Sequence, residues 1–460
     1  MRSLWTGMAV LAVGLSVGMS TVPALAQEKL IIWWTKGFYR AEDEALAAAI
    51  RKFEATSGVK VELTLAPSSV TMAKTQAALA AGAPPDLAYA DSFDLETAAL
   101  WAFEGRLDDL TGVIEPFKDR FAPSALEAAY LLNGETGKRA YYAFPVKQQM
   151  LHIHYWKDML GTAGFKENDI PWDWKEFWSF WCGTVQPAYR EATGEKIHAV
   201  GQPLGIDSAD TYRSFLTWLD AYGVKLVDED GKFLTDDPAV KRGLAAALKD
   251  YVEIYLSGCS PPASATWKAP DNSRAFNARE VMLTHNAGIT IVGKWFDDAN
   301  NRALSPEQRA FGRRAYDEMI ATAAFPKKLD GQPMVYRSSV KVALVFEQSK
   351  HKPQARAFLR FLLENDGLRL HVEGALGRWF PVTIAGQKSP FWLADRHRKA
   401  VYDQYMVGTL PFQADRNYKF AQLNKENVWA KAMHRVIDDK VPVEQAVDEL
   451  LARIREVAGE

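Results

Sequence analysis

Near its N-terminus the chain alternates between apolar patterns typical of strands and of helices. The apolar run Leu30–Trp34 predicts a buried strand, and the 3.6-residue apolar spacing of Glu42–Ser57 predicts a helix. Val59–Leu65 alternates strictly between apolar and polar residues and predicts a second strand, while Leu87–Ala90 predicts a third. With a helix between each pair of strands, this order predicts an α/β fold with a mostly parallel sheet and helices on both faces.

The rest of the chain is richer in helix. The helix between the second and third strands is expected to be capped by Ser68 or Ser69. Two further strands are expected over Ile289–Val292 and Val340–Phe346, and a hairpin turn is expected around Asp230. Apolar stripes with helical spacing predict helices over Trp172–Trp181, Thr211–Tyr222, Pro238–Ser257, Gln354–Leu363 and Val443–Ile454.

The first 26 residues have the pattern of a signal peptide. Arg2 precedes the uncharged apolar run Met8–Met19, which is short for a membrane span, and Ala24-Leu25-Ala26 has the small residues of a cleavage site. We therefore expect export to the periplasm with cleavage after Ala26. A single membrane anchor is the alternative reading of the same residues.

Length and charge exclude several classes of function. The 460 residues are enough for two or three domains, and the formal net charge of -2 provides no basic surface for nucleic acid. The two cysteines, Cys182 and Cys259, are permitted to pair in an oxidising compartment, but the sequence leaves their pairing open.

Catalytic signatures are mostly missing from the sequence. It contains no glycine-rich phosphate loop, no G-x-S-x-G elbow and no H-E-x-x-H motif. His152 and His154 would share one face of a strand and could bind a metal, but with no third ligand nearby, ordinary alternation at a surface or interface is favoured. We expect no metal, no cofactor and no enzymatic activity.

Aromatic residues gather instead where predicted strands end. Trp34 and Phe38 follow the first strand, Trp295 follows the strand predicted at Ile289–Val292, and Trp267 and Trp379 lie in loops beside proline, glycine and polar residues. Carboxyl ends of parallel strands border the ligand crevice of open α/β sheets. Core packing explains any one tryptophan, whereas the whole set favours a polar, ring-shaped ligand such as a sugar.

Several motifs make the chain resemble the family 1 extracellular solute-binding proteins, the maltose-binding-protein-like receptors of carbohydrate ABC importers. They are "KLIIWW…KGF", "FEATSGVKVELTL", "AALAAGAPPDLAYAD", "YYAFPVKQQMLHIHYWKDML", "PWDWKEFW", "ITIVGKWF", "KPQARAFLRFLL" and "NVWAKAMHRVIDDKVPVEQAVDELL". The resemblance extends over residues 27–460 as scattered motifs.

The resemblance implies sugar contacts at Lys36, Asp91, Gln149, Trp295 and Trp429, whereas the remaining candidates come from their positions in loops and at crossings. The candidate ligand-binding residues are Trp34, Lys36, Phe38, Asp91, Gln148, Gln149, Trp267, Trp295, Arg378, Trp379 and Trp429.

The resemblance also implies the periplasmic-binding-protein type II fold, two α/β lobes around a cleft with hinge crossings. Lobe 1 is expected over 27–145 with about 344–380, and lobe 2 over 146–343 with about 381–460. The crossings are expected near Phe144-Pro145-Val146, Val340–Leu344 and Arg378–Val382. The implied function is a monomeric receptor that closes on a sugar or sugar derivative and delivers it to the membrane subunits of an ABC permease.

Three alternatives remain open from the sequence. One is a receptor for another polar solute, namely a polyol, an acidic sugar, a glycerol phosphodiester or a polyamine; Lys36, Lys294 and Arg378 would suit an acidic sugar. A second is a secreted glycosidase, which would need two carboxylates about 5–10 Å apart across the cleft. A third is an adhesin or chemoreceptor partner with an exposed apolar patch.

Overall fold

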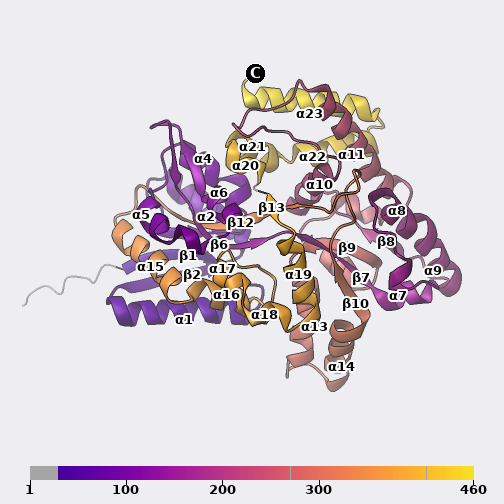
Figure 1. Cartoon of the computed structure of the whole chain (residues 1–460), viewed down its shortest axis with the longest axis horizontal. Coiled ribbons are helices and arrows are strands. Elements are labelled where there is room, and N and C mark those ends of the chain that lie inside the picture. The colour runs from indigo at the N-terminus through magenta and orange to yellow at the C-terminus, as the bar shows by residue number, and fades with distance from the viewer. Residues whose placement is uncertain (1–28, 270, 411) are drawn as a thin grey trace, which may run out of the picture.

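The structure, a computed structural model, describes residues 29–269, 271–410 and 412–460. The predicted signal peptide and its cleavage site lie outside these residues. Within the described ranges, none of the helices combines the length and the apolar character that crossing a membrane requires. Figure 1 shows two groups of strands side by side, each surrounded by helices, with the C-terminal helices along one edge.

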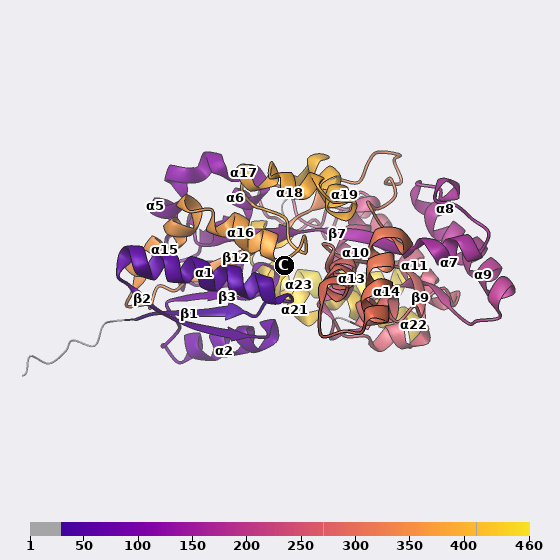
Figure 2. The same ribbon diagram turned by 90° about the horizontal axis from the view of Figure 1, so that it is seen from below.

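The first sheet has the strand order β2-β1-β3-β12-β6. β1 pairs in parallel with both β2 and β3, whereas β12 runs antiparallel to β3 and β6. The predicted mostly parallel sheet is therefore confirmed, with one reversed strand. Figure 2 shows α1 and α2 on opposite faces of this sheet. The elements are β1 (Lys29–Thr35), α1 (Arg40–Ser57), β2 (Lys60–Ala66), α2 (Ser68–Ala80), β3 (Leu87–Tyr89), β6 (Phe144–Gln149), β12 (Ser339–Val345), α15 (Lys352–Glu364) and α16 (Gly367–Gly374).

The second sheet has the order β10-β7-β9-β8, and helices cover it. β7 is antiparallel to β10 and β9, and β8 is parallel to β9. Its elements are β7 (Leu151–Trp156), α8 (Trp174–Ser179), β8 (His198–Gly201), α10 (Ala209–Ala221), α11 (Pro238–Leu256), β9 (Val281–Ala287), α13 (Thr290–Asn300) and β10 (Ile320–Ala323).

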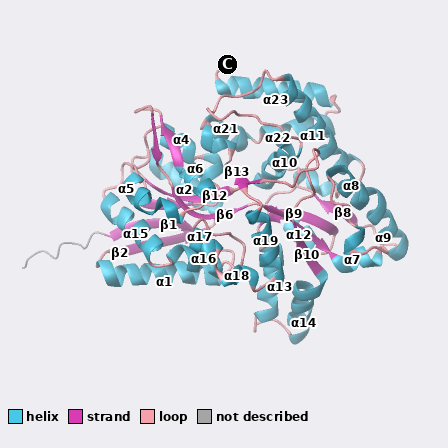
Figure 3. Cartoon of the chain, in the orientation of Figure 1, coloured by secondary structure: helices cyan, strands magenta, loops and turns pink. Residues whose placement is uncertain are grey.

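Shorter elements complete the fold (Figure 3). In the first half they are α3 (Phe93–Glu96), α4 (Ala98–Phe103), α5 (Thr111–Ile114), η1 (Glu115–Arg120), α6 (Pro123–Ala129), β4 (Tyr130–Asn133), β5 (Lys138–Tyr141), α7 (Lys157–Thr162), η2 (Glu167–Asp169), η3 (Phe180–Val185) and α9 (Gln186–Thr193). In the second half they are η4 (Pro262–Thr266), α12 (Asp271–Asn277), α14 (Pro306–Arg314), η5 (Ala315–Met319), β11 (Tyr336–Arg337), α17 (Ile384–Gln387), α18 (Pro390–Leu393), α19 (Arg396–Met406), β13 (Thr409–Leu410), α20 (Gln413–Arg416), α21 (Lys419–Glu426), α22 (Val428–Ile437) and α23 (Val443–Ala458).

Two separate hydrophobic cores pack against the two sheets. The core of the first sheet contains Trp34, Tyr89 and Phe144, and that of the second contains Trp156 and Trp218. The first core takes its residues from 30–146 and 340–368 with Val382, and the second from 150–336 and 372–454 with Leu95. The chain thus passes directly from the first core to the second where β6 leads into β7.

One predicted strand is wrong. Ile289–Val292 lies at the start of α13, and the strand before it is β9, whose sequence VMLTHNA includes three polar residues. These residues hide the strand pattern because hydrogen bonds satisfy them inside the protein: the Thr284 hydroxyl donates to the Gly201 carbonyl at 2.7 Å. The short apolar run Ile289–Val292 is compatible with a buried helix as well as with a strand.

The predicted serine cap of α2 is also wrong. Pro67 occupies the N-cap position, and Ser68 is already inside the helix. The Ser68 hydroxyl accepts a hydrogen bond of 3.0 Å from the backbone N–H of Asp91. The serine therefore fixes the loop that follows β3 rather than the end of its own helix.

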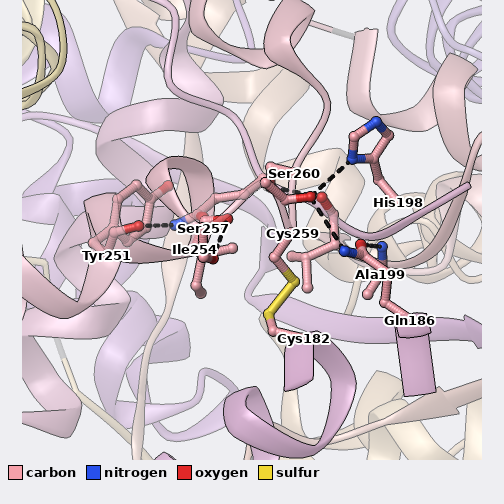
Figure 4. Close-up of a disulfide and its surroundings, with 12 residues drawn as sticks. Cys182, Gln186, His198, Ala199, Tyr251, Ile254, Ser257, Cys259 and Ser260 are labelled. Carbon is pink, nitrogen blue, oxygen red and sulfur yellow. Dashed lines mark hydrogen bonds between the residues drawn. A yellow bond between two sulfur atoms is a disulfide. The ribbon is translucent and has the colours of Figure 1, made fainter. Parts of the chain in front are cut away.

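Cys182 and Cys259 form a disulfide, which answers the question that the sequence left open. Their Cα atoms lie 5.2 Å apart although 77 residues separate them in the chain. Figure 4 shows the bond joining η3, which continues α8, to the turn after α11. It ties together two helical segments on the outer side of the second sheet.

Candidate functional site

A small cavity lies where the two sheets approach each other. From the first sheet it is lined by Gln149 at the end of β6 and by Ser339, its partner at the start of β12. Met150, Leu151, Arg213, Thr217, Ala287, Arg337 and Phe412 complete the lining. We call this space the cleft cavity. Its volume of about 20 Å³ accommodates roughly one water molecule, so this conformation is closed to a larger ligand.

Arg213 on α10 brings an unsatisfied donor to the cleft cavity. Its Nη1 lies 3.5 Å from the Asp210 carboxylate, whereas its buried Nε finds no acceptor within the described residues. The neighbouring Tyr212 hydroxyl donates to Glu96 of α3 across the gap between the cores, at 3.3 Å. A buried donor without an acceptor is costly, so this position favours an oxygen-bearing ligand or a water.

Lys341 and Asp94 form a buried pair beside the cavity. The Lys341 ammonium lies 3.0 and 3.1 Å from the two Asp94 oxygens, and the Ser339 hydroxyl donates to the same carboxylate at 2.5 Å. Burial lowers the pKa of Lys341 to about 8, although the Asp94 charge opposes that shift. The pair holds Ser339 at the mouth of the cavity.

Arg337 lines the cavity from β11 and connects it to α10. Its Nε donates to the Asp220 carboxylate at 2.9 Å. Burial raises the pKa of Asp220, and the Arg337 charge opposes this change. The cavity is therefore surrounded by cations that are matched with carboxylates.

A second buried group of charges lies nearby, where β1, β3 and β6 meet the loop after α16. The Lys147 ammonium lies 2.6 Å from the Glu42 carboxylate, and both side chains are about 2% exposed. Arg378 approaches Asp91 at 3.2 Å and Glu42 at 3.6 Å. We call these four residues the buried ion cluster. Burial raises the pKa of Glu42, but the charges of Lys147 and Arg378 outweigh it and bring that pKa to about 2.

Five predicted site residues gather around the buried ion cluster. Trp34 is buried and stacks on Tyr89 with ring centroids 4.5 Å apart. The Trp379 indole N–H donates to Glu42 at 2.9 Å, and the Arg378 guanidinium lies 4.4 Å from the Trp379 ring centre. Asp91 and Arg378 belong to the cluster itself, and Phe38 is exposed at its edge.

Three further predicted residues have different surroundings: Lys36 from the loop after β1, and Gln148 and Gln149 from the first crossing. Gln149 lines the cleft cavity, and the structure shows no side-chain hydrogen bond for it within the described residues. Both ends of the Gln148 amide are engaged: it donates to the Pro381 carbonyl at 2.8 Å and accepts from Ser338 at 2.6 Å. Lys36 is exposed, and its backbone N–H bonds to Ala66.

Three predicted tryptophans lie in the core of the second sheet rather than along the cleft cavity. Trp429 on α22 is completely buried and donates its N–H to Asn424 at 3.2 Å. Trp295 on α13 packs edge-on against Trp156 and Phe311. Trp267 is almost buried, in the loop after η4. Their role as ligand contacts stays a prediction, and none has a free ring face toward the cleft cavity in this conformation.

The two histidines of β7 are neither at a surface nor at a metal site. Both are buried: His152 bonds to the Gln404 side chain at 2.8 Å, and His154 bonds to Thr322 and to the Gly288 carbonyl at 3.1 Å. The expectation of surface alternation is therefore wrong, because β7 is covered on both faces. Within the described ranges, no group of three acidic, histidine or cysteine side chains is arranged to hold a metal.

Most charged residues near the cavity were missed by sequence reasoning. Two of them carried a usable signal, because Lys147 in "FPVKQQ" and Lys341 in "SVKVALV" interrupt otherwise apolar strands. A lysine in a buried strand needs a partner, which implies a carboxylate from elsewhere in the chain. Arg213 lies in an ordinary amphipathic helix and Asp94 in the four-residue helix α3, so only the tertiary structure reveals them.

Several solved structures of other proteins share this architecture. A protein from Thermotoga lettingae, an ABC transporter solute-binding protein bound with α-D-tagatose, superposes with a TM-score of 0.71 at 18% identity, over 94% of this chain and 99% of its own. Maltose-bound MalE3 of T. maritima gives 0.70 at 21% identity, over 93% and 99%. A sugar transporter protein of Arthrobacter chlorophenolicus with bound laminaribiose gives 0.70 at 14% identity, over 94% and 99%.

These similarities confirm the predicted two-lobe α/β fold of periplasmic binding proteins. No curated protein sequence matches the chain. The sequence model described as bacterial extracellular solute-binding protein matches residues 48–400, about three quarters of the chain. With this match and the fold in agreement, the chain belongs to the bacterial extracellular solute-binding proteins.

Proposed function

We propose that this protein is the periplasmic receptor of an ABC importer and that it binds a neutral sugar between its two lobes. The observation that supports this most directly is the cleft cavity, where Gln149 and Arg213 offer unused hydrogen-bonding groups from the two different cores. Sugar hydroxyls both donate and accept, so they match an amide and a guanidinium together. The structurally similar proteins bound to tagatose, maltose and laminaribiose support the same ligand class.

The charges around the cleft favour a neutral ligand over an acidic sugar. Arg337 and Lys341 are paired with Asp220 and Asp94. Of the three cations that suggested an anion in the sequence, Arg378 pairs with Glu42 and Asp91, and Lys294 pairs with Asp298. The third, Lys36, is exposed and does not line the cleft cavity. An anionic ligand would have to displace these carboxylates, which costs more than hydrogen bonding to an uncharged hydroxyl.

Ligand entry requires the lobes to separate, because the cavity holds only about one water and a ligand pocket is typically several hundred Å³. We place the hinge at the three chain segments that pass between the two cores, near 146–150, 336–340 and 368–382. Lobe 1 would then extend over 27–145 with about 344–380, and lobe 2 over 146–343 with about 381–460. Ligand would stabilise the closed form by binding it more tightly than the open form. The closed form would then be recognised by the permease.

Thermal-shift and calorimetric titrations of residues 27–460 with neutral sugars, polyols, acidic sugars and polyamines test this proposal. A neutral mono- or disaccharide is expected to raise the unfolding midpoint and to bind with a dissociation constant of about 1 μM. If an acidic sugar or a polyamine binds and neutral sugars do not, the receptor function survives but the neutral-sugar class is wrong. If no solute binds, the receptor proposal fails.

Arg213→Ala is expected to weaken sugar binding by about tenfold to a hundredfold, because a hydrogen bond from a charged group is worth about 1.5–3 kcal/mol. Calorimetry with the sugar identified above measures the loss. Arg242→Ala is the matched control, since Arg242 is exposed on α11 and lines no part of the cleft cavity. Equal affinities for the two variants would remove Arg213 from the site.

A further inference from the structure

Tyr39 connects the two lobes at a place outside the cleft cavity. It lies directly before α1 in the first lobe and is only 4% exposed, although it contributes to neither of the two hydrophobic cores that the described residues form. Its hydroxyl donates to the Thr290 carbonyl at the start of α13 at 2.9 Å, across 251 residues of sequence. Figures 1 and 2 show the start of α1 facing α13. Tyr39 is therefore buried by the opposite lobe.

Gly293 on α13 provides the space that the Tyr39 ring occupies. A Cβ atom at this position would lie 2.4 Å from the Tyr39 hydroxyl oxygen and 3.1 Å from its Cζ, and the first of these distances is too short for a real contact. The three atoms closest to that Cβ all belong to Tyr39. An alanine would therefore fit into α13 itself, and it would exclude only the tyrosine of the other lobe.

Both sides of this contact are fixed to their own lobes. The Gly37 N–H donates to the Asp43 carboxylate of α1 at 2.7 Å, which holds the loop that carries Tyr39. On the other side, Ile291 and Val292 anchor α13 in the core of the second sheet. Because each side is anchored in this way, opening of the cleft has to break the hydrogen bond and expose the ring.

Opening this contact has a free-energy cost at any physiological pH. Burial raises the pKa of the Tyr39 hydroxyl above its usual value, so the group stays a hydrogen-bond donor. Opening also returns a large aromatic ring to water and exchanges an internal hydrogen bond for one to water. Together these changes favour the closed arrangement before any ligand has bound.

We propose that Tyr39, Thr290 and Gly293 form a latch that holds the two lobes closed in the absence of ligand. The latch sets the fraction of molecules that are closed, and a ligand that prefers the closed form binds more weakly in proportion as this fraction falls. The inference deepens the proposed function and rests on its separation of the lobes, but it does not depend on the identity of the ligand.

Hydroxyl-radical footprinting with mass spectrometry tests the latch on the mature chain, residues 27–460, without ligand. In the wild type, Tyr39 is expected to be protected from oxidation. Gly293→Ala is expected to raise the oxidation of Tyr39 roughly tenfold, because overfilling a packed contact opposes closure. Tyr39→Phe removes only the hydrogen bond to Thr290, and small-angle scattering should show a larger radius of gyration for this variant than for the wild type.

Gly161→Ala is the matched control, because Gly161 is also a helical glycine of the second lobe and a Cβ atom there would meet no other atom within 4 Å. It should leave Tyr39 protected. Tyr251 is completely buried in the core of the second sheet and should stay protected in every variant that folds.

Two results would overturn the inference. One is oxidation of wild-type Tyr39 as fast as that of Tyr130, which is 44% exposed. The other is that Gly293→Ala raises the oxidation of Tyr39 no more than Gly161→Ala does. If oxidation of Tyr251 shows that Gly293→Ala has not folded, Tyr39→Phe decides, and a radius of gyration equal to that of the wild type then overturns the inference. The sugar titrations report separately on the ligand class.

Discussion

Lowering the pH from 7 to 5 is expected to reduce the free energy of unfolding by roughly 5 kcal/mol, because several histidines are buried in uncharged form. Burial lowers the pKa values of His152, His285 and His371 to about 4 and that of His154 to about 3. In the unfolded chain a histidine has a pKa of about 6.5. Between these values the unfolded state binds more protons than the folded state, so stability is lost as the pH falls from about 6.5 toward 4.

Each of these histidines contributes about 2 kcal/mol to the loss between pH 7 and 5. Buried carboxyl groups offset part of it: burial raises the pKa values of Asp220 and Asp415, which act in the opposite direction. Denaturant unfolding at pH 7, 6 and 5 measures the effect, and near pH 5.5 we expect about three protons to be taken up on unfolding. His285→Gln should reduce this number by about one. If the pH dependence of the free energy of unfolding corresponds to an uptake of less than one proton, the histidines are not buried in uncharged form.

Lys147→Met is expected to lower the free energy of unfolding by about 3–5 kcal/mol, because it leaves the Glu42 carboxylate buried without its closest charge partner. The Trp379 N–H and Arg378 remain near Glu42, but they do not replace an ammonium at 2.6 Å. Neutralising both partners avoids the uncompensated charge. The double variant Glu42→Gln with Lys147→Met is therefore expected to regain at least half of the loss.

Lys29→Met provides the matched control for this prediction. Lys29 also lies on a strand of the first sheet and pairs with Glu62 at 3.6 Å, but the two side chains are 60% and 58% exposed. An exposed pair contributes less than about 1 kcal/mol. Denaturant unfolding of the wild type, Lys147→Met, the double variant and Lys29→Met measures the differences in the free energy of unfolding. If Lys147→Met costs no more than Lys29→Met, the buried ion cluster does not stabilise the fold as described.

The glycosidase and adhesin alternatives are not supported by any finding, whereas membership of the solute-binding family gives a direct account of the two-lobe fold. The buried carboxylates Glu42 and Asp91 are held by Lys147 and Arg378 as ions. Glycoside hydrolysis requires one of its two carboxyl groups to be protonated near neutral pH, and the lowered pKa values of both residues oppose that role.

Local patterns in the sequence were sufficient for four of the five strands of the first sheet, since β6 was not predicted as a strand. Leu30–Trp34 and Val59–Leu65 became β1 and β2. The helix predicted over Glu42–Ser57 is α1, which ends at Ser57 as predicted and begins two residues earlier, at Arg40. Val59–Leu65 and the helix each carry their own period, because one face is apolar and the other is polar, whereas Leu30–Trp34 is recognisable as a short, continuous apolar run. The second lobe was predicted from the family motifs, because the strand and helix patterns alone did not define it.

The site depended on the tertiary structure instead. The family resemblance indicated Asp91 and Gln149, and a loop position indicated Arg378, but the sequence assigned Trp295 to the end of a strand that is a helix. Arg213, Asp94 and Glu42 acquire their roles only when distant segments meet, as Glu42 does with Lys147 over 105 residues. A charge in one segment has no visible partner until the fold brings one to it, and burial then makes that partner necessary.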